Sequence, residues 1–307
     1  MTVIAKDPKA YIHRVTCVTF YTDEVIRAIL EAKGAAYVCD EIARDEDPNY
    51  VKPHLELAVT AHLDPKKLAG KRLLDFGCGA GASTVILARL LPQTEIVGVE
   101  LDDKNLQAAK ARIKFYALRN VTLLKSPAGD KLPKDIGSFE LVMLSAVYEH
   151  LLPNERKTLL PMLWSHLKTG GVMLFDETPW RWFPVETHTT GLPFINYKPD
   201  WFALWCARTF SKRVDKKTTW QSLLRDGIRG GTARGIMRDI GAPAEILKPR
   251  RLGIRNQADL WMRGYADKSI GFSGPLKRIY AYFASLICRL TGMAIVPYLT
   301  VAIKKSI

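Results

Sequence analysis

The sequence predicts an α/β protein built on a doubly wound, mostly parallel sheet. Between Lys71 and Thr178, short apolar runs typical of buried strands alternate with stretches whose apolar residues recur at helical spacing. Such alternation requires crossover connections, which make the strands parallel and cover both faces of the sheet with helices. Ligands of parallel sheets bind beyond the carboxyl ends of the strands. Five polar or glycine residues fall at these ends: Asp75, Gly77, Glu100, Ser145 and Asp176.

The elements follow one another in a regular order. Strands are expected at 72–76, 95–100, 121–125, 139–145 and 171–177, and helices at 82–91, 104–118 and 155–167. The run AIVPYLTVAI at 294–303 is rich in β-branched residues, which predicts a last strand.

An amphipathic helix is expected just before that last strand, over 276–290. Its apolar stripe is Leu276, Ile279, Tyr280, Phe283, Leu286, Ile287 and Leu290. We expect this stripe to dock into the core, with contact at a membrane surface as the alternative.

A glycine-rich turn, LLDFGCGAGAST at 73–84, follows the first expected strand. Gly77, Gly79 and Gly81 permit positive φ and close approach of a ligand to the backbone, and the next helix offers its N-terminal amides. Glu100 ends the second strand, where a carboxylate can accept two hydrogen bonds from a ribose diol. A tight strand-to-helix turn without a ligand uses the same residue types. The interpretation of this turn as a ligand site therefore depends on the surrounding strands.

The segment LLDFGCGAG at 73–81 resembles the cofactor loop of the class I S-adenosylmethionine-dependent methyltransferases, and the match covers about 71–178 plus the last strand. The resemblance implies a Rossmann-like fold with a seven-stranded sheet, and S-adenosylmethionine as the cofactor. It implies that the three loop glycines surround the methionine part of the cofactor and that Asp75 orients the loop or meets the amino group through water. Glu100 is then expected to hold the ribose hydroxyls and Leu101 to pack on the adenine.

The chain departs from the family pattern after the third strand. It reads KSPAGDKLP, with Pro127 where the family often has an acid that reaches the adenine, and Asp130 comes three residues later. We expect Ala128 and Gly129 to offer backbone contacts to the cofactor. By the same resemblance, Ser145 at the end of the fourth strand lies near the methyl-donor pocket.

Two histidines are candidates for a general base. His150 follows the fourth strand within YEHL, and His188 lies in an insert after the fifth. A pKa near 6.5 suits proton transfer at neutral pH, but methyl transfer needs a base only when the acceptor arrives protonated. The alternatives are a packing or helix-start role for His150 and an ordinary loop role for His188. No metal site is expected.

The insert at 176–210 is unusually aromatic and is expected to form a cap over the active site. Trp180, Trp182 and Tyr197 would line an apolar or planar acceptor, and Arg181 would pair with an anionic group on it. The alternative is a second hydrophobic cluster with ordinary turn prolines. The predicted organisation is an N-terminal helical lid (1–70), a cofactor-binding core (71–178), the cap insert (179–230), and C-terminal helices with the last strand (231–307).

Charge and cysteine content bound the function further. Residues 1–180 hold equal numbers of basic and acidic side chains, so the whole net charge of +14 lies in 181–307. An anionic acceptor or an anionic membrane surface is therefore a reasonable partner. Five scattered cysteines without a C-x-x-C pair, and an N-terminus without an apolar run, favour a reducing cytoplasm, with peripheral membrane contact left open.

The favoured function is methyl transfer to a small-molecule acceptor, with O-methylation slightly ahead of N- or C-methylation. The alternatives are a basic protein of the same fold that binds a membrane surface or nucleic acid, or a methyltransferase for a lipid or phosphorylated acceptor. MLSAVYEH after the fourth strand lacks the N-P-P-Y and D-P-P-Y motifs of adenine methylation, which argues against nucleic acid as substrate. The sequence does not indicate an oligomeric state.

Overall fold

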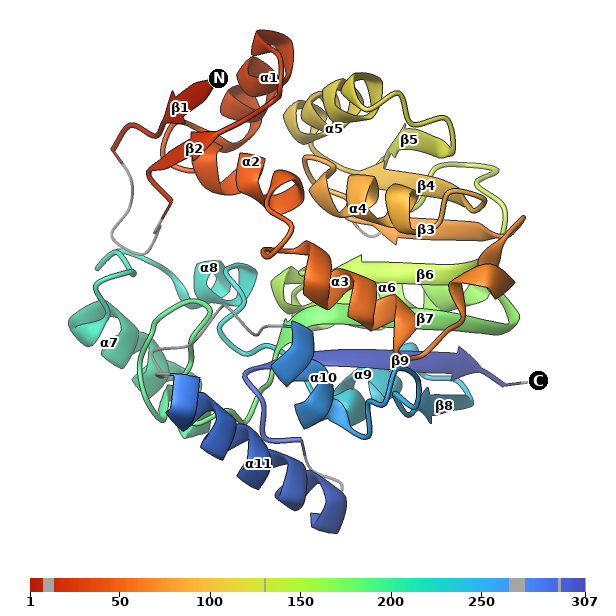
Figure 1. The fold of residues 1–307 in the computed structure, drawn as a ribbon. Helices are drawn as coiled ribbons and strands as arrows, with labels where there is room; N and C mark the ends of the chain where they lie inside the picture. The colour runs from red at the N-terminus through yellow and green to blue at the C-terminus, as the bar shows by residue number, and fades with distance from the viewer. Residues whose placement is uncertain (8–13, 130, 265–273, 292–293, 307) are drawn as a thin grey trace.

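A seven-stranded sheet forms the centre of the computed structural model, which describes residues 1–7, 14–129, 131–264, 274–291 and 294–306, without the side chains of 274–277. The strand order is β5-β4-β3-β6-β7-β9-β8 (Figure 1). Neighbours from β5 to β7 pair in parallel, and β9 runs antiparallel to β7 and β8. The strands are β3 (Arg72–Phe76), β4 (Glu95–Glu100), β5 (Val121–Lys125), β6 (Phe139–Ser145), β7 (Leu167–Pro179), β8 (Ala244–Leu247) and β9 (Tyr298–Lys305).

The doubly wound, mostly parallel sheet expected from the sequence is confirmed. The first four strands begin and end at the predicted residues, and β9 is the predicted last strand. β7 is longer than expected, because Thr178 and Pro179 continue its pairing with Leu299 and Tyr298 of β9.

Helices cover both faces of the sheet. They include α3 (Lys52–Thr60), α4 (Ala82–Leu90), α6 (Pro153–His166) and α9 (Ala233–Ile240). Successive side chains of a strand point to opposite faces. Leu73 of β3 accordingly packs in a buried cluster with residues of α3 and α4, whereas its neighbour Leu74 packs with residues of α6 and α9.

A buried arginine, Arg112, bonds the N-terminal part of the chain to the loop that follows β3. This part consists of a hairpin of β1 (Thr2–Ile4) and β2 (Thr16–Val18), followed by α1 (Asp23–Lys33) and α2 (Val38–Glu46). Arg112 of α5 (Asp103–Phe115) is fully buried and donates to Glu41 Oε1 at 2.9 Å and to the carbonyl of Ala80 at 2.6 Å. The guanidinium therefore joins α2 to the loop between β3 and α4.

The insert folds around a small hydrophobic cluster of its own. It contains the short helix η3 (Ile195–Tyr197), α7 (Asp200–Phe210) and α8 (Trp220–Arg225). Ala203 and Ala207 of α7 are buried in this cluster, whereas Trp201, Trp205 and Phe210 of the same helix are 74%, 51% and 60% exposed. The small residues of α7 therefore make its interior contacts, and these three aromatic residues face outward.

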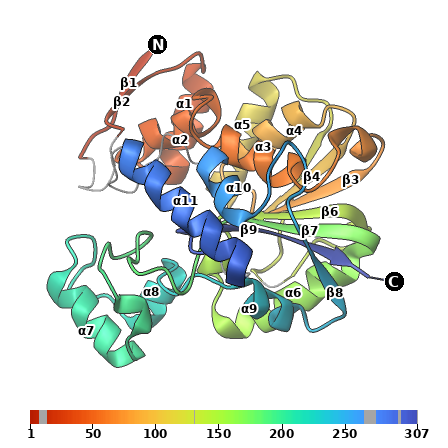
Figure 2. The same cartoon turned by 60° about the horizontal axis from the view of Figure 1, so that its bottom comes forward.

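The predicted C-terminal amphipathic helix exists as α11 (Gly274–Thr291), and it lies across the outside of the fold beside α10 (Gln257–Gly264) (Figure 2). The predicted docking face is correct for Tyr280, which packs against the main core, and wrong for most of the other stripe residues. Ala281, Ala284 and Ser285 are buried, while Ile279 and Phe283 of the expected stripe are exposed. The side chain of Leu276 lies outside the described residues. Within the described chain, none of the helices has the length and apolarity needed to cross a membrane.

Candidate active site

The carboxyl ends of the parallel strands meet at one edge of the sheet, and α2, α7 and α8 lie beyond that edge (Figure 1). The loop after β3 and the loop after β6 are in direct contact there: a Cβ added at Gly77 would lie 2.9 Å from Cγ2 of Val147. Two non-glycine residues at this edge, Ala146 and Glu177, adopt φ of +53° and +57°. Positive φ in such residues is uncommon and concentrates at functional sites.

The three glycines of the first loop all have positive φ, but they have different surroundings. A Cβ at Gly81 would lie 2.8 Å from the backbone of Ala109, so Gly81 allows α4 to pack closely on α5. A Cβ at Gly79, where φ is +55°, would find only Lys33 Nζ, at 4.0 Å. The space beside Gly79 is therefore open, as a ligand that approaches the backbone requires.

Two carboxylates hold this loop in place. Glu100 accepts from the backbone N–H of Gly79 at 2.8 Å through Oε2, and from the N–H groups of Leu101 and Asp102, both at 2.9 Å, through Oε1. Asp75 is buried and accepts from Thr84 Oγ1 at 2.7 Å, which ties β3 to α4. Burial raises the pKa of Asp75 to about 6, the hydrogen bond from Thr84 lowers it, and the charge of Glu100 adds to the increase.

The other residues expected to contact the cofactor lie around the same edge. Leu101 is half exposed, and a Cβ at Gly129 would lie 3.8 Å from its Cδ2, so the two residues flank one another. The carbonyl of Ala128 already accepts from Ser126 Oγ. Ser145 Oγ is buried without a hydrogen-bond partner, and an unpaired buried hydroxyl is costly unless a ligand completes it. Asp130 lies outside the described residues.

The two candidate base histidines, distant in sequence, lie side by side. The ring centroids of His150 and His188 are 5.4 Å apart. His150 Nδ1 lies 2.6 Å from the carbonyl of Arg225, so this nitrogen carries the hydrogen and Nε2 keeps its lone pair. Burial lowers the pKa of His188 to about 4 and also lowers the pKa of His150.

A third member of this cluster, Glu149, was missed from the sequence although it adjoins His150. Glu149 is fully buried, neither carboxyl oxygen has a hydrogen-bond partner, and Oε1 lies 3.8 Å from His150 Nε2. Burial raises its pKa to about 8. One ligand atom each from Glu149, His150 and His188 lie within 4.8 Å of one another, so this group could also hold a metal ion.

A buried charge network behind the edge was also missed. His54 Nδ1 lies 2.8 Å from Asp176 Oδ2, and its Nε2 lies 3.4 Å from Glu177 Oε1. Burial acts to lower the pKa of His54, but the carboxylates of Glu177 and Asp176 outweigh it and raise the pKa. Thr300 of β9 donates to Asp176 at 2.7 Å, and Arg44 of α2 contacts Glu177 at 3.4 Å. The network therefore links α2, α3, β7 and β9 at the ends of the strands.

The four cap residues expected to bind the acceptor occupy two places. Trp180 packs against the main core. Trp182 and Tyr197 stack with centroids 6.1 Å apart, both about half exposed, and the Arg181 guanidinium lies over the Trp182 ring. Arg181 also donates to the carbonyl of Asn196, and burial lowers its pKa to about 10. A role for these four residues in acceptor binding stays a prediction.

Known proteins resemble the part of the chain that carries the glycine loop. Residues 74–173 match a family model described as a methyltransferase domain. The demethylmenaquinone methyltransferase of Lactococcus lactis subsp. lactis is 27% identical over 175 residues, which are 57% of this chain and 66% of that protein. The carboxy-S-adenosyl-L-methionine synthase of Photobacterium profundum is 26% identical over 34% of this chain and 43% of that protein.

Among solved structures, the plantazolicin methyltransferase BpumL in complex with SAH aligns with 92% of this chain and 95% of its own, at 10% identity and a TM-score of 0.45. The aligned part of this chain covers less than two thirds of the length of the two curated relatives, the methyltransferase and the synthase. The residues that match the family model run from β3 into β7 and include the glycine loop.

Proposed function

The chain contains a class I S-adenosylmethionine-dependent methyltransferase domain, and we propose that the whole protein transfers a methyl group from this cofactor to a hydroxyl of a small-molecule acceptor. The observation that carries the proposal is the open space beside Gly79, next to the carboxylate of Glu100. The acceptor would enter between the parallel edge and the insert, where His150 and His188 meet.

The residues of the parallel edge fit the donor. The open backbone at Gly79 suits the methionine part, and the exposed Leu101 beside Gly129 offers an apolar surface for the adenine. The bound cofactor supplies a methyl group on a sulfonium, which is already a good leaving group. Positioning is therefore the main task of the protein, and a base is needed only for the acceptor proton.

The histidine cluster supports acceptance of that proton by His150. Its Nδ1 is oriented by the carbonyl of Arg225, which leaves the Nε2 lone pair on a partly exposed side chain. His188, with a pKa of about 4, is a much weaker base and serves better as a neutral wall. Glu149 Oε1 lies 3.8 Å from His150 Nε2, but its raised pKa of about 8 leaves the carboxyl mostly neutral at pH 7, so the imidazolium that forms gains little from its charge.

A methyl-transfer assay with labelled S-adenosylmethionine and a panel of phenols, sugars and hydroxy acids tests the proposal. With the acceptor that reacts, His150→Ala should lower kcat about 10²–10⁴-fold and remove the fall in rate at acid pH. Its affinity for S-adenosylhomocysteine should stay within about twofold, because the contact is to the acceptor and not to the donor. His166→Ala is the matched control, since His166 is a partly exposed residue at the end of α6 whose Nδ1 bonds the carbonyl of Gly137.

Two results would contradict this assignment. An unchanged pH profile in His150→Ala would show that the base lies elsewhere. Loss of activity on addition of EDTA to the wild-type enzyme would replace direct proton transfer with activation by a metal ion at Glu149, His150 and His188. If calorimetry detects no binding of S-adenosylhomocysteine, the assignment of S-adenosylmethionine as methyl donor is overturned as well.

A further inference from the structure

Helix α11 presents its large apolar residues to solvent and its small residues to the protein. Its buried residues include Ala281, Ala284 and Ser285. The exposed residues, with their exposed fractions, are Ile279 (53%), Tyr282 (69%), Phe283 (56%), Leu286 (40%) and Leu290 (77%). We call these five residues the α11 stripe.

The spacing of the α11 stripe places its residues along one side of the helix, because residues three and four apart lie above one another. Scattered exposed apolar residues are ordinary, but a contiguous patch on a helix marks a surface that contacts a partner or a membrane. The stripe therefore requires an occupant that is itself apolar.

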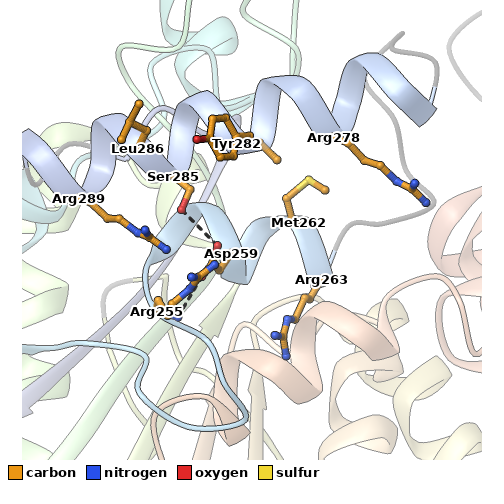
Figure 3. A pocket seen from close by; sticks show the side chains of 10 residues that line it. Arg255, Asp259, Met262, Arg263, Arg278, Tyr282, Ser285, Leu286 and Arg289 are labelled. Carbon is orange, nitrogen blue, oxygen red and sulfur yellow. Dashed lines mark hydrogen bonds and ion pairs between the residues drawn. The ribbon is translucent and has the colours of Figure 1, made fainter.

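A basic pocket lies beside the stripe, between α10 and α11. Its volume is about 420 Å³, within the range of ligand sites. Arg278 and Arg289 line it from opposite ends of α11, and Arg255 and Arg263 line it from the side of α10 (Figure 3). Tyr282 and Leu286 belong both to the pocket lining and to the α11 stripe.

The positive charge of the pocket is poorly compensated. Asp259, the one acid among the described residues that line it, is engaged by Arg255 at 3.0 Å and by Ser285 at 3.3 Å. Arg278 and Arg289 have no carboxylate within 4 Å in the described part of the chain. Guanidinium groups bind phosphate oxygens in a fork geometry, so an anion with several oxygens suits this pocket.

We propose that α11 docks the protein on an anionic lipid surface, with the α11 stripe entering the acyl boundary and the basic pocket taking a lipid phosphate. The combination of an apolar stripe with flanking cations is what interfacial helices use. A second copy of this chain fits less well, because it would bring arginine-lined pockets of equal charge face to face. The net charge of +14, all of it in 181–307, also favours an anionic partner.

Helix α7 exposes large aromatic residues at a second place on the surface. Its exposed Trp201 and Trp205 belong to a chain of ring contacts that reaches Phe210, and the next turns carry exposed Lys212 and Lys216. Tryptophan and lysine together are typical of membrane–water boundaries. The insert also touches α11, through Phe183 and Tyr280 with centroids 6.5 Å apart.

Sedimentation of the full-length protein with vesicles of phosphatidylcholine, with and without phosphatidylglycerol, tests the proposal. We expect binding to the anionic vesicles only, weakening at high salt because exposed charges are screened. Arg278→Ala with Arg289→Ala should weaken binding about thirtyfold, since each basic residue near an anionic surface contributes about a fivefold gain. Phe283→Ser with Leu290→Ser should weaken it at least about tenfold.

Matched controls separate these effects from charge and apolarity in general. Lys66→Ala with Lys67→Ala removes two exposed cations from the other half of the chain, and Phe20→Ser removes an apolar side chain that is 88% exposed. Both should bind vesicles as the wild type does. S-adenosylhomocysteine affinity and far-UV circular dichroism report that every variant is folded, independently of the methyl-transfer assay.

Three outcomes would overturn the proposal. If the double variant Phe283→Ser, Leu290→Ser binds anionic vesicles as tightly as the wild type, the stripe does not enter the lipid. Binding of glycerol phosphate in the pocket by a protein that does not bind vesicles would assign the pocket to a soluble phosphate compound. A wild-type dimer that Leu290→Ser converts to a monomer, again without vesicle binding, would show that the stripe joins two copies of the chain.

Discussion

Replacement of Gly79 by valine separates the fold of the glycine loop from its proposed role in cofactor binding. Gly79 has φ of +55°, which costs a residue with a Cβ about 1–2 kcal/mol. The added Cβ meets no protein atom closer than Lys33 Nζ at 4.0 Å, so no clash adds to that cost. The variant should therefore fold, with Tm lowered by about 2–8 °C at the usual 2–4 °C per kcal/mol for a chain of this size.

The same side chain would occupy the open space beside Gly79 in which we propose that the cofactor binds. We expect the affinity for S-adenosylhomocysteine, measured by isothermal titration calorimetry, to fall at least about 100-fold, which corresponds to about 2.7 kcal/mol. Gly81→Ala is the informative comparison, because its Cβ would lie 2.8 Å from the backbone of Ala109. That variant should lose more thermal stability than Gly79→Val, since the crowding is within the protein. A folded Gly79→Val protein with unchanged affinity would refute the placement of the cofactor beside this loop.

Three further predictions rest on charged groups of the same region. Glu100→Ala should weaken S-adenosylhomocysteine binding by about 1–3 kcal/mol, because the carboxylate also holds three loop N–H groups; equal dissociation constants by calorimetry would contradict this. The raised pKa of Asp75 means that the folded protein binds this proton more tightly than the unfolded chain, so stability falls as pH rises from about 4 to about 6. In urea denaturation, the free energy of unfolding of Asp75→Asn should thus exceed that of the wild type by up to about 3 kcal/mol at pH 7 and by little at pH 4. A difference between the two proteins that does not vary with pH would disprove this prediction. Arg112→Ala leaves Glu41 and Asp45 without their buried partner and should cost about 3–5 kcal/mol of unfolding free energy, so a loss below about 1 kcal/mol would show that the two acids are neutralised in another way.

The parallel sheet and the glycine loop could be predicted because their signals are local in the sequence. Buried parallel strands appear as continuous apolar runs, and a strand that enters G-x-G-x-G must turn with positive φ. Glu100 was found in the same way, since the end of a parallel strand is fixed once the strand is recognised. Its bond to the N–H of Gly79 could not be foreseen, because it depends on the register of β3 against β4.

The missed features depend on contacts between distant segments. His54 meets Asp176 across more than a hundred residues, and only the packing of α3 on β7 brings them together. Glu149 escaped notice because nothing in YEHL indicates that its carboxyl is buried without a partner. The orientation of α11 was misjudged because apolar periodicity shows that a helix has an apolar side, but not whether the protein covers it.

The N-terminal helices are linked to the glycine loop by buried polar contacts. Arg112 holds the carbonyl of Ala80, within the glycine loop, and the same guanidinium is bonded to Glu41 of α2. Lys33, at the end of α1, has its ammonium near the open space at Gly79. Movement of α1 and α2 away from α5 would therefore break buried charge contacts and release the loop. Because an unpaired buried guanidinium is costly, the ordered loop and the docked helices stabilise each other, and ligand binding beside Gly79 should protect α2 from hydrogen exchange as well as the loop.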